Sequence, residues 1–144
     1  MIRQMQASDI DALVDLALAL WPDHIREELA SEFAPLLAAK DAAIFGLWQD
    51  GRWEAFAQCQ LRHDYVEGCE TSPVGYLEGI YVREHLRGRG VAKALLAACQ
   101  VWAKEKGCRE FASDCELSNE DSLRFHLAAG FREAGRIICF IKQL

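Results

Sequence analysis

The chain has 144 residues, of which 51% are hydrophobic, so its length and composition suit a single domain, residues 1–144, with a substantial core. Its formal net charge of −6 disfavours nucleic acid as a partner, because phosphates bind to a basic surface. No long uncharged apolar stretch is present to span a membrane, and the start lacks the basic-then-apolar pattern of a signal peptide, so we expect a cytoplasmic protein. The six cysteines form no C-x-x-C pair, so we expect no metal site.

The first half of the chain predicts a strand, two helices and a hairpin. Ser8 or Asp9 is a candidate N-cap, because its side-chain oxygen can accept the free N–H groups of the first helix. Pro22 ends this helix or begins the next one. Asp50 and Gly51 both tolerate positive φ and predict a tight turn between two strands. The expected elements are a strand over 2–6, helices over 10–20 and roughly 32–39, and strands over 42–48 and 53–65.

The second half alternates strands and helices. Gly107 and Gly130 are expected to end its two helices. The expected elements are a strand over 74–83, a helix from residue 91, a strand over 110–113, a helix over 119–129, and final strands over 131–133 and 137–142. Helices mixed with both hairpins and crossover connections indicate an α/β fold with a mixed sheet.

The stretch from Val82 to Lys93 predicts an anion site. A strand ends there, a glycine-containing turn follows and an amphipathic helix begins, so free backbone N–H groups and the positive end of a helix dipole converge. Gly88 and Gly90 allow the backbone to approach a phosphate closely. Four cations crowd the same turn: Arg83, Arg87, Arg89 and Lys93. The alternative is a basic surface turn ahead of a helix, and the spacing matches neither a kinase-type P-loop nor the dinucleotide glycine fingerprint.

Acidic stretches lie on both sides of this basic loop, and two carboxylates in them are candidate functional groups. Strand alternation places Glu78 on one face with Tyr76, Ile80 and Val82, where a carboxylate is costly unless a cation meets it. An exposed edge or a salt bridge to an arginine is the structural alternative. Asp114 follows a strand, and ligands of open α/β sheets gather beyond the carboxyl ends of strands. Solvated loops are the other explanation for such charge runs.

Two motifs in the last third of the chain resemble those of the GNAT superfamily of N-acetyltransferases. They are Arg87-x-x-Gly90-x-Ala92 and Asn119-x6-His126-x3-Gly130-Phe131. The resemblance implies an α/β GNAT fold, in which a central mixed, mostly antiparallel twisted β-sheet is flanked by helices, with acetyl-CoA as co-substrate and no metal. The implied coenzyme contacts are the strand residues Ile80, Tyr81 and Val82, the loop residues Arg87, Gly88, Arg89, Gly90, Val91 and Ala92, and Asn119.

His126 stands where most members of the superfamily carry a tyrosine. That tyrosine donates a proton to the departing thiolate, so the resemblance implies a catalytic role for His126. A histidine can donate a proton at neutral pH. A core histidine with a structural role is the alternative.

A longer stretch, from Arg62 to Ile80, resembles the bacterial aminoglycoside 6'-N-acetyltransferases, as do Leu20-Trp21-Pro22 and the segment 111–114. The resemblance implies an enzyme that acetylates the 6'-amino group of aminoglycoside antibiotics by direct attack in a ternary complex, confers resistance and forms a homodimer with exchange of strand 137–142. The implied drug contacts are Trp21, His24, Tyr65, Glu78 and Asp114.

By the same resemblance, Glu78 is the candidate to take a proton from the attacking amine, and Asp114 helps to orient that amine. Two other functions stay open. One is a GNAT enzyme that acts on a polyamine, a metabolite amine or a peptide N-terminus, and the other is a CoA-binding regulatory module. The phosphate loop reads only the donor, whereas the acidic stretches favour an aminoglycoside.

Overall fold

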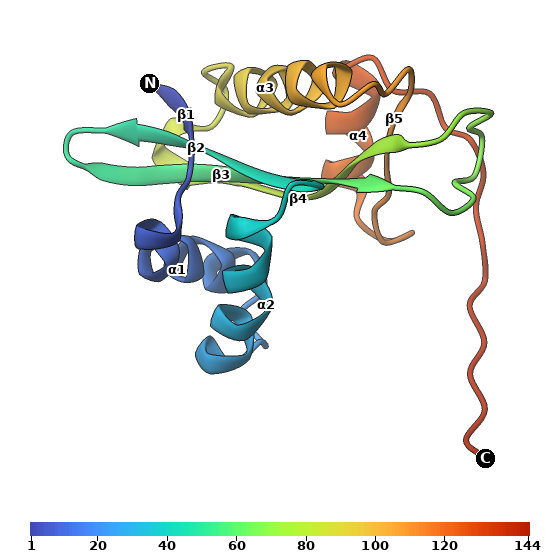
Figure 1. The fold of residues 1–144 in the computed structure, drawn as a ribbon, viewed down its shortest axis with the longest axis horizontal. Coiled ribbons are helices and arrows are strands. Elements are labelled where there is room, and N and C mark those ends of the chain that lie inside the picture. The colour runs from blue at the N-terminus through green and yellow to red at the C-terminus, as the bar shows by residue number, and fades with distance from the viewer.

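One five-stranded sheet, in the order β1-β2-β3-β4-β5, separates two layers of helices in the computed structural model, which describes residues 1–144 (Figure 1). The helices α3 and α4 cover one face, and α1 and α2 cover the other. Strands β1 to β4 pair antiparallel, and β5 pairs parallel with β4. The elements are β1 (Ile2–Gln4), η1 (Ala7–Asp9), α1 (Ile10–Leu20), α2 (Arg26–Ala38), β2 (Ala42–Gln49), β3 (Arg52–Arg62), β4 (Val74–Val82), η2 (Glu84–Leu86), α3 (Val91–Glu105), β5 (Phe111–Ser113) and α4 (Glu120–Ala128). The expected mixed, mostly antiparallel α/β sheet is confirmed.

The turn chemistry of the sequence holds at the β2–β3 hairpin, where Asp50 has φ 51° and Gly51 has φ 79°. Asp9 is the N-cap residue of α1, as predicted, but its side chain makes no capping bond to that helix. The carboxylate of Asp9 instead accepts the backbone N–H of Gln6 at 2.8 Å and the indole N–H of Trp53 at 3.0 Å. Because η1 leads directly into α1, the chain is already helical there and the side chain is free to tie the helix to β3.

Each face of the sheet has its own core. On one face, Leu95, Cys99 and Trp102 of α3 pack on small residues of β3 such as Ala57. On the other face, α1 and α2 pack on the sheet around Phe56, which is fully buried. None of the helices combines the length and apolar composition needed to cross a bilayer.

A β-bulge in β4 overturns one expectation about Glu78. Gln58 of β3 pairs with Gly79 and Cys59 pairs with Leu77, so Glu78 has no partner on β3. The extra residue reverses the alternation beyond it. Ile80 therefore packs on the α3 side with Leu77, whereas Glu78 lines a cleft on the α2 side. The prediction that Glu78 shares a face with Ile80 and Val82 is wrong for this reason.

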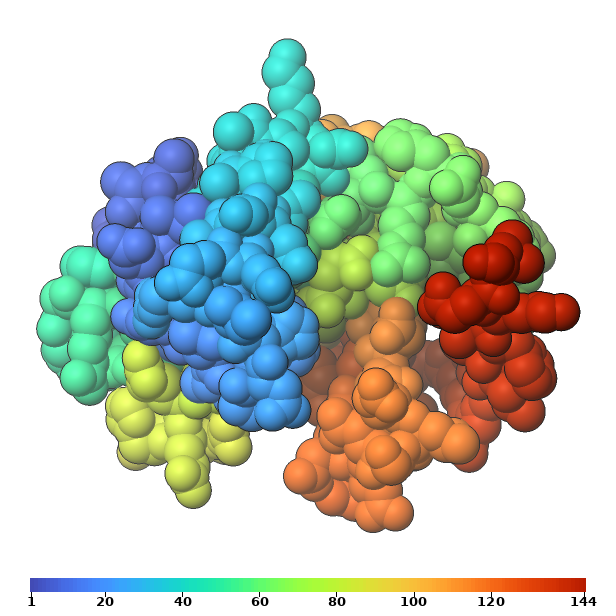
Figure 2. Space-filling view, turned by 90° about the horizontal axis from the view of Figure 1, so that it is seen from below, coloured from blue at the N-terminus to red at the C-terminus, as the bar shows by residue number.

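The two final strands predicted over 131–133 and 137–142 are also absent. The chain leaves α4, passes the loop between β3 and β4 at Ala134 and Gly135, and then projects away from the sheet as an extended tail (Figures 1 and 2). No neighbouring strand lies beside it to supply the ladder hydrogen bonds that define a strand. Its apolar side chains are consequently exposed: Ile137 77%, Ile138 81%, Phe140 91% and Ile141 89%.

Candidate active site

The sheet opens where β4 and β5 stop pairing. The parallel ladder joins Gly75 to Phe111 and Leu77 to Ser113, and β5 ends there. β4 continues to Val82, so its residues 78–82 have no strand on that side. An unpaired strand edge offers backbone N–H and C=O groups to an extended ligand. Residues Ile80, Tyr81 and Val82, expected to contact coenzyme, lie on this open edge.

The glycine loop lies at the end of the same strand. Gly88 and Gly90 have φ of 74° and 79°, the left-handed region in which other residues are strained. Gly90 is the N-cap of α3 and brings no side-chain oxygen, so no cap competes for the N–H groups of the first turn. Those amides and the helix dipole form a site suited to an anion.

Arg87 has a structural contact that the sequence did not predict. Its Nε–H donates to the carbonyl oxygen of Val82 at 2.9 Å, which ties the loop back onto the end of β4. Its guanidinium also lies 5.6 Å from the ring centroid of Tyr81. Arg87 therefore shapes the loop, and its side chain makes no other hydrogen bond within the chain.

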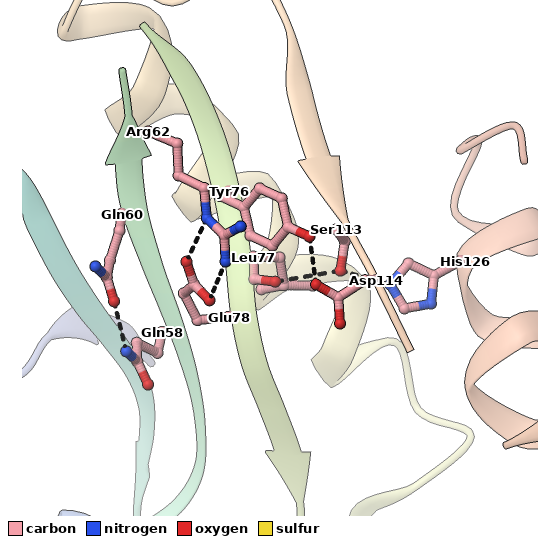
Figure 3. Close-up of polar contacts among 9 residues, drawn as sticks. All are labelled: Gln58, Gln60, Arg62, Tyr76, Leu77, Glu78, Ser113, Asp114 and His126. Atoms are coloured by element: carbon pink, nitrogen blue, oxygen red, sulfur yellow. Dashed lines mark hydrogen bonds and ion pairs between the residues drawn. The ribbon is translucent and has the colours of Figure 1, made fainter. Parts of the chain in front are cut away.

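Glu78 is paired with Arg62 of the neighbouring strand β3 (Figure 3). The Nε–H and Nη2–H groups of Arg62 donate to the two carboxylate oxygens at 3.0 and 2.9 Å. The guanidinium also stacks 3.4 Å from the ring centroid of Tyr76. Burial lowers the pKa of Arg62, but the hydrogen bonds to Glu78 more than offset this, so its pKa is raised. The salt-bridge alternative for Glu78 is thus present. Each carboxylate oxygen still has a free lone pair for a second cation.

Asp114 is joined to β4 through Tyr76, whose hydroxyl donates to Oδ2 of Asp114 (Figure 3). Burial, followed by the hydrogen bond to Asp114, raises the pKa of Tyr76 well above its usual value, so the phenol remains a donor. Tyr76 lies two residues before Glu78, and Arg62 stacks on its ring. One aromatic side chain therefore links both candidate carboxylates.

His126 of α4 lies beside Ser113, at the fork where β5 ends and its pairing with β4 stops (Figure 3). Its Nδ1 is 2.7 Å from the carbonyl oxygen of Ser122, and its Nε2 is 2.8 Å from Oγ of Ser113. That hydroxyl is also 3.2 Å from the carbonyl oxygen of Leu77. A carbonyl oxygen only accepts, so the Nδ1–H of His126 donates to Ser122. The ring is therefore held by α4 through Ser122 and by β5 through Ser113.

A cleft of about 220 Å³ lies between α2 and the sheet, beside Glu78. Its lining residues are Trp21, His24, Leu29, Glu32, Phe33, Leu36, Gln58 and Glu78. The rings of Trp21 and His24 are 5.8 Å apart. Trp21 lies directly on Gly79, where an added Cβ would be 2.8 Å from its ring. The absence of a side chain at position 79 thus lets Trp21 form the wall of the cleft.

The structure gathers some of the expected site residues and not others. Trp21, His24 and Glu78 share the cleft. Tyr65 is 79% exposed and bonds Glu67 at 3.2 Å, so it lies outside that lining. Asn119 caps α4, because its side-chain oxygen accepts the N–H of Ser122 at 3.0 Å. Its side-chain amide N–H groups make no bond within the chain and remain for a ligand.

Sequence reasoning assigned no role to several residues that the site uses. Arg62 and Gly79 belong to the stretch that resembles the aminoglycoside acetyltransferases, but no role was predicted for either. Glu32 was predicted only as part of a helix. Arg62 could have been suspected as the ion-pair partner of Glu78, because it lies on the neighbouring strand. The bulge at Glu78, which decides which β3 residues lie near it, could not be foreseen. No group of three or more His, Cys, Asp or Glu side chains is arranged to hold a metal ion.

Comparisons with known proteins agree with this geometry. The family model described as the acetyltransferase (GNAT) family matches residues 10–131. An aminoglycoside N(6')-acetyltransferase type 1 of Serratia marcescens is 45% identical over 139 residues, 94% of each chain. The enzyme of the same name in Salmonella typhimurium is 44% identical over 142 residues, 99% of this chain and 98% of its own.

Solved structures of similar proteins superpose over the whole chain. AAC(6')-Iy in complex with the bisubstrate analogue CoA-S-monomethyl-acetylneamine has a TM-score of 0.95 and 42% identity, covering 100% of this chain and 98% of its own. The aminoglycoside 6'-N-acetyltransferase AAC(6')-IG from Acinetobacter haemolyticus has a TM-score of 0.95 and 36% identity, covering 100% and 99%.

Proposed function

Because the chain belongs to the acetyltransferase (GNAT) family, and within it to the aminoglycoside N(6')-acetyltransferases, we propose that it transfers the acetyl group of acetyl-CoA to the 6'-amino group of an aminoglycoside and thereby confers resistance. The observation that carries this proposal is the position of Glu78. It lies at the start of the open edge of β4 and also lines the cleft. A donor along that edge and a cationic acceptor in the cleft meet at this residue.

The donor side uses backbone groups. The first-turn amides of α3 and the loop Arg87–Ala92 hold the diphosphate, since that helix end is uncapped. The extended arm of the coenzyme adds to β4 along Ile80–Val82, and the Asn119 amide donates to it. An N–H of this strand polarises the thioester carbonyl as negative charge develops on its oxygen. Acetyl-CoA supplies the activated acyl group.

The acceptor side uses carboxylates. Glu78 and Asp114 attract the ammonium groups of the drug, and Trp21 and His24 form an aromatic wall against its sugar rings. Glu78 takes the proton that the amine must lose before it attacks, directly or through a water molecule. Asp114 orients the amine, and Tyr65 contacts the outer part of the drug. Holding both reactants in one complex supplies a large part of the rate, so no acetyl-enzyme intermediate is needed.

His126 returns a proton to the departing thiolate. Its contacts with Ser122 and Ser113 hold the imidazole in a fixed orientation, and a histidine can donate a proton at neutral pH. The hydroxyl of Ser113 connects His126 to the carbonyl oxygen of Leu77, the last β4 residue that pairs with β5, next to the strand edge that the coenzyme arm follows.

We also propose that the chain forms a homodimer and that the segment 137–142 of each copy pairs with the other copy. Four large apolar residues of this segment are more than three-quarters exposed in the single chain: Ile137, Ile138, Phe140 and Ile141. Such a continuous strip is covered in stable proteins. Light scattering after size exclusion measures the mass, and a chain truncated after Gly135 is the matched control. A monomeric full chain would contradict the dimer.

An acceptor panel tests the proposed activity. Release of free thiol from acetyl-CoA is measured with kanamycin, tobramycin, spermidine and short peptides. We expect rapid release with the two aminoglycosides and slow release with the others, because only a polycationic sugar fills the carboxylate-lined cleft. Faster turnover of spermidine or a peptide would replace the aminoglycoside by that acceptor. If the chain binds acetyl-CoA but releases no free thiol with any acceptor, the chain is a CoA-binding regulatory module instead of an enzyme.

A further inference from the structure

A buried carboxylate lies under the first residues of the phosphate loop, outside the cleft and the fork. The side chain of Glu54 in β3 is 2% exposed. Leu47 pairs with Ala55 and Trp48 pairs with Trp53, so Glu54 is the extra residue of a β-bulge and has no partner on β2. Bulges change the direction of a side chain relative to the regular strand. The bulge thus places a negative charge inside the protein.

Three basic side chains, two arginines and a histidine, surround this carboxylate, and two of them belong to the loop. Arg83 Nε lies 3.1 Å from Oε2, and His85 Nε2 lies 3.5 Å from Oε1. The third, Arg52, donates to Oε1 at 2.7 Å and is two-thirds exposed on the hairpin. The backbone N–H of Arg83 also donates to the carbonyl oxygen of Glu54 at 3.1 Å. Both main chain and side chain of Glu54 therefore hold the point where β4 passes into η2.

The carboxylate has no function in the acceptor cleft or at the fork, yet its burial is costly. Its Oε2 accepts no well-aligned hydrogen bond, although Arg83 lies close to it. An ion pair with a buried carboxylate contributes little to the stability of a fold, because desolvation of that carboxylate offsets most of the attraction. Such pairs are better suited to fixing the position of the groups that they join.

Arg83 is the N-cap of η2, and η2 leads directly into Arg87 and the two left-handed glycines. We propose that Glu54 is a positioning residue for coenzyme binding, which fixes Arg83 and His85 so that the following loop presents its amides to the diphosphate of acetyl-CoA. This inference rests on the proposed function. Glu54 itself contacts no substrate.

The test compares Glu54→Gln with Arg52→Gln. Arg52 contacts the same carboxylate but lies on the hairpin, so its replacement leaves the loop contacts intact. Titration calorimetry with CoA, and kcat and KM for acetyl-CoA and kanamycin, are measured on each. We expect Glu54→Gln to weaken CoA binding and raise the KM for acetyl-CoA about tenfold, with kcat at saturating acetyl-CoA and the KM for kanamycin unchanged.

A second variant, Glu54→Asp, keeps the test valid if Glu54→Gln unfolds the chain. The shorter side chain keeps the negative charge but withdraws it from Arg83 and His85, so we expect CoA binding to be weakened while a circular-dichroism melt shows a folded chain. An unchanged CoA affinity in a folded variant would overturn the inference, and so would equal weakening by Arg52→Gln. Failure of the unaltered chain to bind CoA would instead overturn the proposed function.

Discussion

Arg62 and Glu78 form a two-point ion pair across β3 and β4, with N–O distances of 3.0 and 2.9 Å, at the wall of the cleft. The side chain of Glu78 is 20% exposed, so the pair is partly shielded from water. A cationic acceptor therefore approaches a carboxylate that is already held in position. Arg62 keeps Glu78 oriented before any ligand arrives. The effect of Glu78 on catalysis and the effect of Arg62 on stability can therefore be measured separately.

Replacement of Glu78 by glutamine removes the negative charge and keeps the shape. We expect kcat/KM for kanamycin to fall about 10²- to 10³-fold, because the amine loses both its anchor and its base. CoA affinity should not change, since the loop lies at the other end of β4. The matched control is Glu105→Gln, an exposed carboxylate at the end of α3. A kcat/KM equal to that of the control would remove Glu78 from the mechanism.

Replacement of Arg62 by methionine leaves Glu78 without its cation. We expect the free energy of unfolding to fall by about 1 kcal/mol, a value discounted because Arg62 is 42% exposed. Arg136→Gln breaks an exposed ion pair with Glu133 and should cost less than half as much. Urea titration followed by fluorescence measures both. Equal losses in the two variants would mean that burial adds nothing to the Arg62–Glu78 pair.

Gly90 and Gly51 allow the loop to be tested with an unusually close control, because both have φ 79° and neither Cβ would meet an atom within 4 Å. Alanine at either position costs about 1 kcal/mol from the left-handed backbone alone. We expect only Gly90→Ala to raise the KM for acetyl-CoA, since Gly51 lies in the β2–β3 turn. A similar KM for the two variants would show that the loop amides do not read the donor.

Gly79 makes room for Trp21, so Gly79→Ala is expected to displace the indole and raise the KM for kanamycin. The Cβ would lie 2.8 Å from the ring, and overpacking of this kind costs about 1–3 kcal/mol. The double variant Gly79→Ala with Trp21→Leu should recover stability but not drug affinity. Thermal melts and steady-state kinetics measure the two effects. An unaltered KM in the single variant would show that Trp21 does not contact the drug.

His126→Gln retains a hydrogen-bonding side chain and removes the acid. We expect kcat to fall about 10²-fold while CoA affinity is unchanged, since the thiolate must then take its proton from solvent. His63→Gln, an exposed histidine in the β3–β4 loop, is the control. If kcat survives in His126→Gln, the imidazole has a structural role at the fork and the thiolate is protonated otherwise.

The sequence predicted the elements that depend on local chemistry. Helical spacing placed α1 and α3, and Asp50–Gly51 marked the hairpin, because these signals lie within a few residues of one another. The glycine loop was found in the same way. The bulges were not predictable, because a bulge depends on how a strand pairs with its neighbour, and apolar residues on both faces of β4 conceal the change in alternation. The prediction that Ile80 lies on the same face as Glu78 was wrong because of the bulge in β4.

The contacts around the carboxylates depend on the register between strands. Arg62 and Glu78 meet only because β3 and β4 pair as they do, and Tyr76 reaches Asp114 only because β5 lies parallel beside it. A strand also needs a partner, so the apolar alternation of 137–142 could not by itself fix where that segment pairs. The family resemblance identified Glu78 and Asp114 as candidates, but the side chains that contact them could be identified only from the fold.

The opening between β4 and β5 has a consequence for the behaviour of the chain in solution. Bare strand edges recruit strands from other molecules and so promote aggregation, which most proteins prevent with charges, prolines or a covering element. This one lies inside the sheet, limited by the last β4–β5 pair at Leu77 and by η2 after Val82. A gap of five residues, from 78 to 82, closed at both ends, is too short to template a growing ribbon and admits a single thin ligand. The fold thus keeps a reactive edge without the usual hazard.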